Sequence, residues 1–510
     1  MKRTALIAFL LFMQVSNLVA NEIAVTNVSL VNRNKSLDYV FVNFDLSWNN
    51  SFRTSSGAAN WDAAWVFVKY KIGETGEWKH ATLNNGGHTI PTGTATTQTD
   101  GTGIFLYRNS DGTGTFTKTG IQLRWNYGTD GVADDSKIFV KVFAIEMVYI
   151  PSGDFQLGSG SQTESGFRVA NDVSSSGTAT TFTVTSTSPT LQGNNVNSSG
   201  TNLSTQDGLS LDLGTTTNTA TLASDFPTGH GAFYSMKYEI SQGQYRDFLN
   251  TLTYSQQVNR TAFAPNSAVG TGALISSGNN RNGIEISTSG TNSSAPAVYG
   301  CDLNNNGVYD ETDDGEWIVC NYLSWADLAA YLDWAALRPI TELEFEKISR
   351  GTAAPVADEY CWGNTTLVGL AAISNDRQAG EVSNTTNANA VYNNNFTTGP
   401  VRVGIFATAS SDRVASGGSY YGVMEMSGNV WEQVIRIENS TGRSFTGSKG
   451  NGQLTTDGDA DASSWPDYTG ACKRGGSWQS AASNIQLSSR NGATLHGSSR
   501  DSETGGRGAR

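Results

Sequence analysis

The sequence predicts an α+β protein that is preceded by an all-β, sandwich-like domain. Apolar and polar residues alternate through the first third of the chain, and three later segments carry the start signals and apolar stripe of helices. The composition is also rich in Gly, Ser, Thr and Asn, which favours strands and turns over long helices. With 510 residues, of which 37% are hydrophobic and 15% charged, the chain is long enough for two or more domains.

Residues 1–20 have the features of a secretory signal peptide. Lys2 and Arg3 precede a short apolar run over residues 4–15, and Leu-Val-Ala at 18–20 is a suitable cleavage site. The run is shorter than the ~20 residues of a membrane-spanning helix, and a buried helix or a membrane anchor is the alternative. No later segment is apolar enough to span a membrane. We therefore expect an exported, soluble protein that is secreted, periplasmic or held at the cell surface.

Residues 21–145 are predicted to form the all-β domain. Their alternating runs are separated by turns rich in Gly, Asn and Asp, which is typical of an antiparallel sandwich. No catalytic constellation occurs in this region. The alternating runs cover residues 23–30, 39–48, 64–70, 121–125 and 138–143.

The charge of the chain argues against nucleic acid as a partner. The net charge is −13, and it is −15 without residues 1–20, which carry two basic residues and no acid. Nucleic-acid binding needs clustered Lys and Arg, whereas an acidic chain is compatible with bound cations.

The second domain is predicted over residues 146–510. It contains a stretch at about 159–225 that is rich in Ser, Thr, Gly and Asn and poor in charge. This stretch is either a disordered insertion or an additional β-hairpin region. Apolar alternation at 181–185 and 209–213 favours some strand within it.

Three helices of the second domain are marked by capping boxes, in which Ser or Thr is followed three residues later by Gln, Asp or Glu. After the first box, Tyr245, Phe248 and Leu249 share one apolar face. The second helix is predicted to run to residue 337, and Gly351 is predicted to end the third. The boxes begin at Ser241, Ser324 and Thr341.

The chain has four cysteines, and an even number in an exported protein suggests disulfides. Cys301 and Cys320 bracket a compact loop and are the first predicted pair, which leaves Cys361 and Cys472 as the second. Four buried free thiols are the alternative.

Residues 302–313 match the pattern of an EF-hand-type calcium loop, in which oxygen ligands at fixed positions converge on one ion. Gly307 occupies the position of the sharp turn, and the shorter Asp313 replaces the usual final Glu, for which Asp314 or Glu316 could substitute. The alternative is an Asn/Gly-rich surface turn without an ion. The candidate ligands are Asp302, Asn304, Asn306, Val308 through its carbonyl, Asp310 and Asp313.

Several motifs in the right order resemble the formylglycine-generating enzyme family, also called sulfatase-modifying factors. They include a hydrophobic-Ile-Pro-x-Gly-x-Phe run at 147–155, Cys-Trp-Gly-Asn at 361–364, Gly-Asn-Val-Trp-Glu at 428–432 and Arg-Gly-Gly-Ser-Trp at 474–478. The resemblance covers residues 147–158 and 233–510. It implies a sulfatase-modifying-factor variant of the C-type lectin fold.

The resemblance also implies a chemistry that this chain lacks residues to perform. Catalytic members bind copper through two cysteines after the Arg-Gly-Gly-Ser-Trp signature and oxidise a substrate cysteine with O2. Ser480 and Ile485 stand near those two positions here. Soft thiolates hold Cu(I), whereas serine is a poor ligand and isoleucine is none, so copper is not expected and no catalytic residue is assigned.

Two further sets of site residues follow from the resemblance. A calcium ion lies on the 428–432 segment in catalytic relatives, which makes Asn429 and Glu432 its candidate side-chain ligands, although both could instead have purely structural roles beside the core residue Trp431. The second set is a ligand groove between residues 420–432 and 474–507. Its candidate residues are Tyr420, Tyr421, Trp478, Arg490 and Arg507.

The sequence therefore predicts an exported, non-catalytic protein that binds a ligand or forms cell-surface structure, with calcium ordering its loops. The expected partner is a glycan, a peptide or a neighbouring surface protein. The alternatives are a formylglycine-generating oxidase that matures sulfatases and a subunit of an extracellular assembly or motility apparatus.

Overall fold

The computed structural model describes residues 23–98, 100–161, 166–169, 180–192, 209–210, 220–276, 278–292, 295–408 and 410–510. The predicted signal peptide and most of the predicted insertion at 159–225 lie outside these residues.

The described chain is mostly β with few helices, as predicted. Its longer strands lie in the first third: β1 (Ala24–Asn34), β2 (Tyr39–Arg53), β3 (Asp62–Ile72), β4 (Lys79–His80), β5 (Thr94–Gln98), β6 (Ile104–Arg108), β7 (Gly112–Trp125) and β8 (Ile138–Ile150). Shorter strands follow: β9 (Phe155–Leu157), β10 (Phe182–Val184), β11 (Leu191–Gln192), β12 (Leu209–Ser210), β13 (Phe233–Met236), β14 (Ile284–Thr288), β15 (Val298–Cys301), β16 (Arg338–Pro339), β17 (Ile373–Ser374), β18 (Val382–Ser383), β19 (Trp431–Ile435), β20 (Ala471–Arg474), β21 (Thr504–Gly505) and β22 (Gly508–Ala509).

Within the described residues, five α-helices accompany these strands: α1 (Gln242–Leu249), α2 (Tyr254–Arg260), α3 (Trp325–Trp334), α4 (Glu342–Arg350) and α5 (Ser440–Arg443). Three of them start where the sequence predicts, because Ser241, Ser324 and Thr341 each form both hydrogen bonds of a capping box. Helix α4 ends at Gly351, which has a positive φ of 65°. No helix among the described residues is long and apolar enough to cross a membrane.

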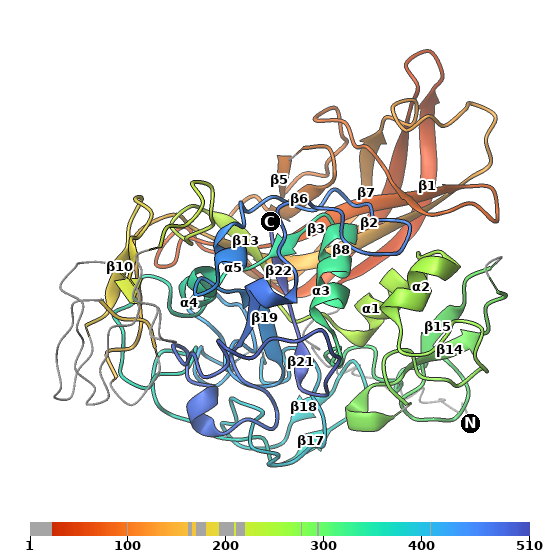
Figure 1. The fold of residues 1–510 in the computed structure, drawn as a ribbon. Coiled ribbons are helices and arrows are strands. Elements are labelled where there is room, and N and C mark those ends of the chain that lie inside the picture. The colour runs from red at the N-terminus through yellow and green to blue at the C-terminus, as the bar shows by residue number, and fades with distance from the viewer. Residues whose placement is uncertain are drawn as a thin grey trace, which may run out of the picture.

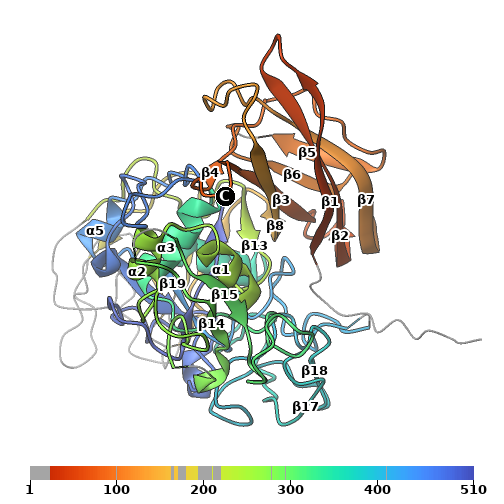
Figure 2. The ribbon, with the colours of Figure 1, turned by 90° about the vertical axis from the view of Figure 1, so that its right-hand side faces the viewer.

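Two sheets organise the first third of the chain (Figures 1 and 2). One has the antiparallel order β1-β2-β7. The other has eight strands, with the order β16-β22-β13-β8-β3-β6-β5 and β4 paired to β3. Alternate residues of β2, including Phe44 and Trp48, share one buried cluster with Val66 of β3 and Leu123 of β7. This cluster is the core between the two sheets.

Strand β8 runs through the predicted domain boundary at residues 145 and 146. Its first half contributes Val142 to the core between the two sheets, and its second half contributes Val148 and Ile150 to a separate core that includes Phe345 of α4. β8 pairs with β3 from Asp62↔Val148 to Ile72↔Ile138 and with β13 from Phe233↔Ile150 to Met236↔Met147. The two predicted regions therefore share one sheet.

The second face of β3 packs on the C-terminal region. Trp65 donates its indole N–H to the carbonyl of Ala335 at 2.8 Å, and Phe67 meets Trp334 edge-on with ring centroids 5.2 Å apart. Lys69, which is also buried, donates to the carbonyl of Trp334 at 2.8 Å. Strand β3 is consequently buried on both faces along most of its length.

Candidate metal centre

The predicted calcium loop follows strand β15 directly, so its position is fixed by the β14–β15 hairpin. In that hairpin Ile284 pairs with Cys301, and the N–H of Asp302 donates to the carbonyl of Gly283 at 2.9 Å. Gly307 has a φ of 80°, as the sharp turn of the loop requires.

Four of the six predicted ligands lie together. The carboxylate of Asp302, which is buried, accepts hydrogen bonds from the backbone N–H groups of Asn306 at 3.0 Å and Gly307 at 2.9 Å. The side-chain oxygen of Asn304 also accepts from the N–H of Asn306, at 3.0 Å, and its amide donates to Asp313 at 3.0 Å. These contacts bring Asp302, Asn304, Asn306 and Asp313 to one side of the loop.

The other two predicted ligands are Val308 and Asp310. Val308 is exposed, and its N–H donates to the side-chain oxygen of Asn306 at 2.7 Å. Asp310 lies against helix α1, where its carboxylate accepts from Arg246 at 2.6 Å and from the N–H of Cys301 at 2.8 Å. The carboxylate of Asp310 is thus engaged by an arginine and a backbone N–H group, and its role as a ligand stays a prediction.

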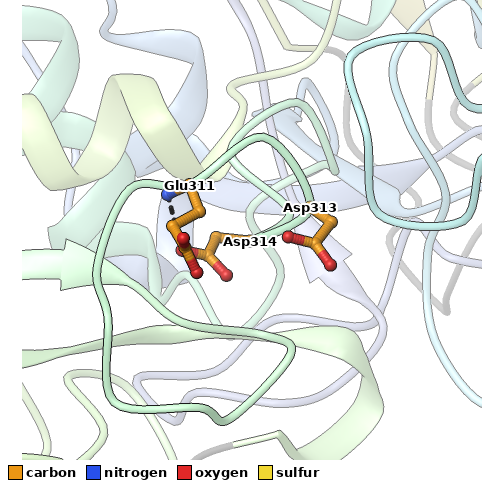
Figure 3. Close-up of side chains that lie close together, drawn as sticks. All are labelled: Glu311, Asp313 and Asp314. Atoms are coloured by element: carbon orange, nitrogen blue, oxygen red, sulfur yellow. Dashed lines mark hydrogen bonds between the residues drawn. The ribbon is translucent and has the colours of Figure 1, made fainter.

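Glu311, Asp313 and Asp314 form a cluster in which one carboxylate oxygen from each residue lies within 4.8 Å of the others. In the view of Figure 3 the carboxylate of Asp314 lies between those of Glu311 and Asp313. Oδ2 of Asp314 accepts from the N–H of Glu311 at 2.7 Å, whereas Oδ1 is buried and has no hydrogen-bond partner among the described residues. Burial raises the pKa of Asp314.

Glu285 of strand β14 is a further acid beside this loop, and no sequence pattern identified it. Its side chain is buried, and Oε1 has no hydrogen-bond partner in the described part of the chain. Burial, together with the charges of Asp302 and Asp314, raises the pKa of Glu285 to about 7. Only the hairpin register, which pairs β14 with the strand before the loop, places this residue there.

The second predicted calcium ligands, Asn429 and Glu432, are engaged by the protein itself. The amide of Asn429 accepts from the N–H of Val401 at 3.0 Å and donates to Glu239 at 2.7 Å. Oε1 of Glu432 accepts from Arg507 at 2.8 Å. Asn429 therefore has no side-chain oxygen left without a partner.

Buried carboxylate oxygens nevertheless remain near that segment. Oε2 of Glu425 and Oε2 of Glu432 have no hydrogen-bond partner among the described residues. Glu425 lines a cavity of about 10 Å³ with Ser427 and Asn429, and burial raises its pKa to about 7. These two oxygens are buried in the same segment, whereas the side-chain oxygen of Asn429 already has a partner.

The Arg-Gly-Gly-Ser-Trp signature is part of the protein core. Arg474 pairs with Glu346 of α4 at 2.9 Å, and the indole N–H of Trp478 donates to the carbonyl of Ser502 at 3.0 Å. Ser480 accepts from the N–H of Ser477 at 2.9 Å. Ile485 is buried against Gly476, where an added Cβ would lie 2.3 Å from its side chain. The two positions of the copper cysteines thus carry a hydroxyl and an alkyl group.

Four of the five predicted groove residues are buried and cannot line an open groove. Tyr421 and Trp478 are core residues, Arg490 pairs with Glu342 at 2.8 Å, and Arg507 pairs with Glu432. Only Tyr420 is partly exposed. The two arginines neutralise buried carboxylates, and the groove stays a prediction.

Neither predicted disulfide is present, because all four cysteines are buried free thiols. Burial raises the pKa of each thiol, in the case of Cys361 to about 12. Cys361 donates to the carbonyl of Gly417 at 3.2 Å. The thiols are therefore protonated at neutral pH, and their surroundings do not favour the thiolate form that binds copper.

Comparison with known proteins finds one matching family. The model of the sulfatase-modifying factor enzyme 1-like domain matches residues 194–510. No curated protein matches the chain.

Proposed function

The chain belongs to the sulfatase-modifying factor enzyme 1-like family, and from that premise we propose that it is an exported, non-catalytic member. In this proposal the family domain has the C-type lectin fold and the strands before it form a β-sandwich. The protein acts by binding or as part of cell-surface structure.

The observation that carries the proposal is the pair of residues after the signature. Ser480 is held by Ser477, and Ile485 is buried against Gly476. Neither side chain offers the soft thiolate that Cu(I) requires. The buried thiols elsewhere in the chain have raised pKa values, which further disfavours a substitute copper site.

Copper loading and turnover test this proposal. The purified protein is titrated with Cu(I) and incubated under O2 with a cysteine-containing sulfatase peptide, with a catalytic family member as the positive control. We expect no stoichiometric copper and no formylglycine product. Product formation that is abolished in Ser480→Ala would show that the chain is an oxidase and overturn the proposal.

The proposed partner is a glycan, a peptide or a neighbouring surface protein. Because the predicted groove residues are mostly buried, the contact surface lies elsewhere on the molecule.

A subunit role in an extracellular assembly or motility apparatus is the second candidate. Strand β1 favours it, since it lies at the edge of its sheet with Val28 and Leu30 exposed, and an open strand edge can pair with another chain. Electron microscopy of the purified protein would show regular polymers in that case.

The proposed cofactor is calcium, which would order the loop at residues 302–313. The contacts among Asp302, Asn304 and Asp313 support this, because they gather oxygen atoms of the type that calcium prefers. Calorimetry with Ca²⁺ tests it, and absence of binding would contradict it, whereas binding that is unchanged in Asp302→Ala would contradict the EF-hand-type ligand set.

A further inference from the structure

We infer that the cation of this loop is bound by Asp314, Glu311 and Asp313, that the buried acid Glu285 of strand β14 supports this site from outside the ligand set, and that Asp310 is not a ligand. This inference rests on the proposed calcium role and changes its ligand set. Glu285, Glu311 and Asp314 all lie outside the EF-hand-type ligand positions.

The first step is the buried carboxylate of Asp314. Its Oδ1 has no hydrogen-bond partner in the described chain, and the residue is fully buried. Burying a charge without a partner is strongly unfavourable unless a counter-charge or a metal compensates it. No ion pair of Asp314 with Lys, Arg or His occurs among the described residues, so a bound cation is the compensation that fits.

The second step is the spacing of the cluster. Calcium binds oxygen at about 2.3–2.6 Å, so two oxygens on one ion lie at most about 5 Å apart. The oxygens of Glu311, Asp313 and Asp314 lie within 4.8 Å of one another and meet this limit. Magnesium demands near-ideal octahedral geometry and usually keeps several waters, so a cluster of three carboxylates suits calcium better. The spacing therefore admits calcium without rearrangement.

The third step brings in Glu285. Its Oε1 is the second buried carboxylate oxygen near the loop without a partner among the described residues. The charges of Asp302 and Asp314 both act on it, which places the three acids in one electrostatic neighbourhood. The bond from Asp302 N–H to the carbonyl of Gly283 fixes the loop to the strand that carries Glu285. A cation at the cluster of Glu311, Asp313 and Asp314 would therefore also act on the charge of Glu285.

Asp310 is excluded from the ligand set by its existing contacts. Its carboxylate accepts from Arg246 and from the N–H of Cys301, and Arg246 also holds Glu316 at 3.1 Å and Asp247 at 2.9 Å. A ligand role would break a charge-assisted bond of 2.6 Å. Asp310 thus anchors the loop to α1, and this role provides a matched control.

The test is a Ca²⁺ titration of the full chain by calorimetry, comparing Asp314→Asn and Glu285→Gln with Asp310→Asn. Each variant removes one carboxylate charge and keeps the side-chain size. We expect binding to weaken by about tenfold or more in the first two variants, and to stay within about twofold of wild type in Asp310→Asn. Mg²⁺ should bind more weakly than Ca²⁺ in all four proteins.

The possible results distinguish an error in the ligand set from an error in the calcium role itself. Wild-type binding that is lost in Asp310→Asn and retained in Asp314→Asn would favour the EF-hand-type ligand set and overturn this inference alone. Absence of Ca²⁺ binding by the wild type would overturn the proposed calcium role as well, whereas the copper test of the non-catalytic proposal is independent of both. If circular dichroism shows that Asp314→Asn is unfolded, Glu311→Gln takes its place with the same expected loss.

Discussion

One buried lysine forms ion pairs with two carboxylates where β3, β8 and β13 meet. The ammonium of Lys237 lies 3.1 Å from Asp62 and 3.1 Å from Glu146. Asp62 also accepts from the indole of Trp48 at 3.1 Å and from the N–H of Phe52 at 3.0 Å, so its charge is well compensated. The charge of Glu146 is compensated by Lys237, which it shares with Asp62. Burial and the charge of Asp62 together raise the pKa of Glu146 to about 7.

This shift predicts a pH dependence of stability. The folded pKa of Glu146 lies above the ordinary value of 4.5, so the fold favours the protonated form and its contribution to the free energy of unfolding falls between about pH 4.5 and pH 7. In Glu146→Gln this loss is absent. Urea unfolding at both pH values should show the wild type losing about 3 kcal/mol relative to the variant. Parallel pH profiles would contradict the shifted pKa.

At the scale of elements, local signals predicted helix starts well and tertiary contacts poorly. The starts of α1, α3 and α4 were predictable because a capping box lies within four residues. Helix α2 carries the same signal at Thr253 and Gln256 and was missed, although the residues were sufficient to find it. The place of Glu285 was not predictable, because it depends on the register of two strands and not on spacing within the loop.

The N-terminal cap of α4 should contribute more to the stability of the fold than the short length of this helix suggests. The reason is that α4 carries Glu346, the partner of Arg474 in the signature. The hydroxyl of Thr341 accepts from the N–H of Glu344 at 3.1 Å and donates to the carbonyl of Pro227 at 2.9 Å. Thr341→Ala should lower the free energy of unfolding by about 1–2 kcal/mol, measured by chemical denaturation. The control is Thr352→Ala just beyond the helix, which is exposed and should change it by less than about 0.5 kcal/mol. Equal losses of stability in the two variants would contradict a stabilising role of the Thr341 cap.

At the scale of the whole molecule, the sequence suggested two consecutive domains, and the structure has one eight-stranded sheet with strands from both regions. The continuous apolar run at residues 63–68 was the available signal, since a strand that is apolar on both faces is covered on both faces. Alternation in the neighbouring strand β2 predicted that alternate residues of it would be buried. It did not predict that the second face of β3 would meet Trp334 from a helix far along the chain.

The shared sheet predicts one unfolding transition for the full chain. Phe67→Ala removes a buried ring that contacts both Phe143 and Trp334, and should cost about 3–5 kcal/mol. Scanning calorimetry should show the whole transition moving to a lower temperature. Ile72→Ala, at an exposed end of the same strand, should leave it nearly unchanged. Two separate transitions, or a shift of only part of the heat absorption, would show that the two regions unfold independently.

Strand β8 also has a mechanical consequence. It pairs with β3 over eleven residues and with β13 over four, and it passes from one region to the other without leaving the sheet. A tensile load applied between the two regions cannot be absorbed by extending a linker there, and must instead shear rows of backbone hydrogen bonds together. The two regions consequently keep a fixed mutual orientation under strain.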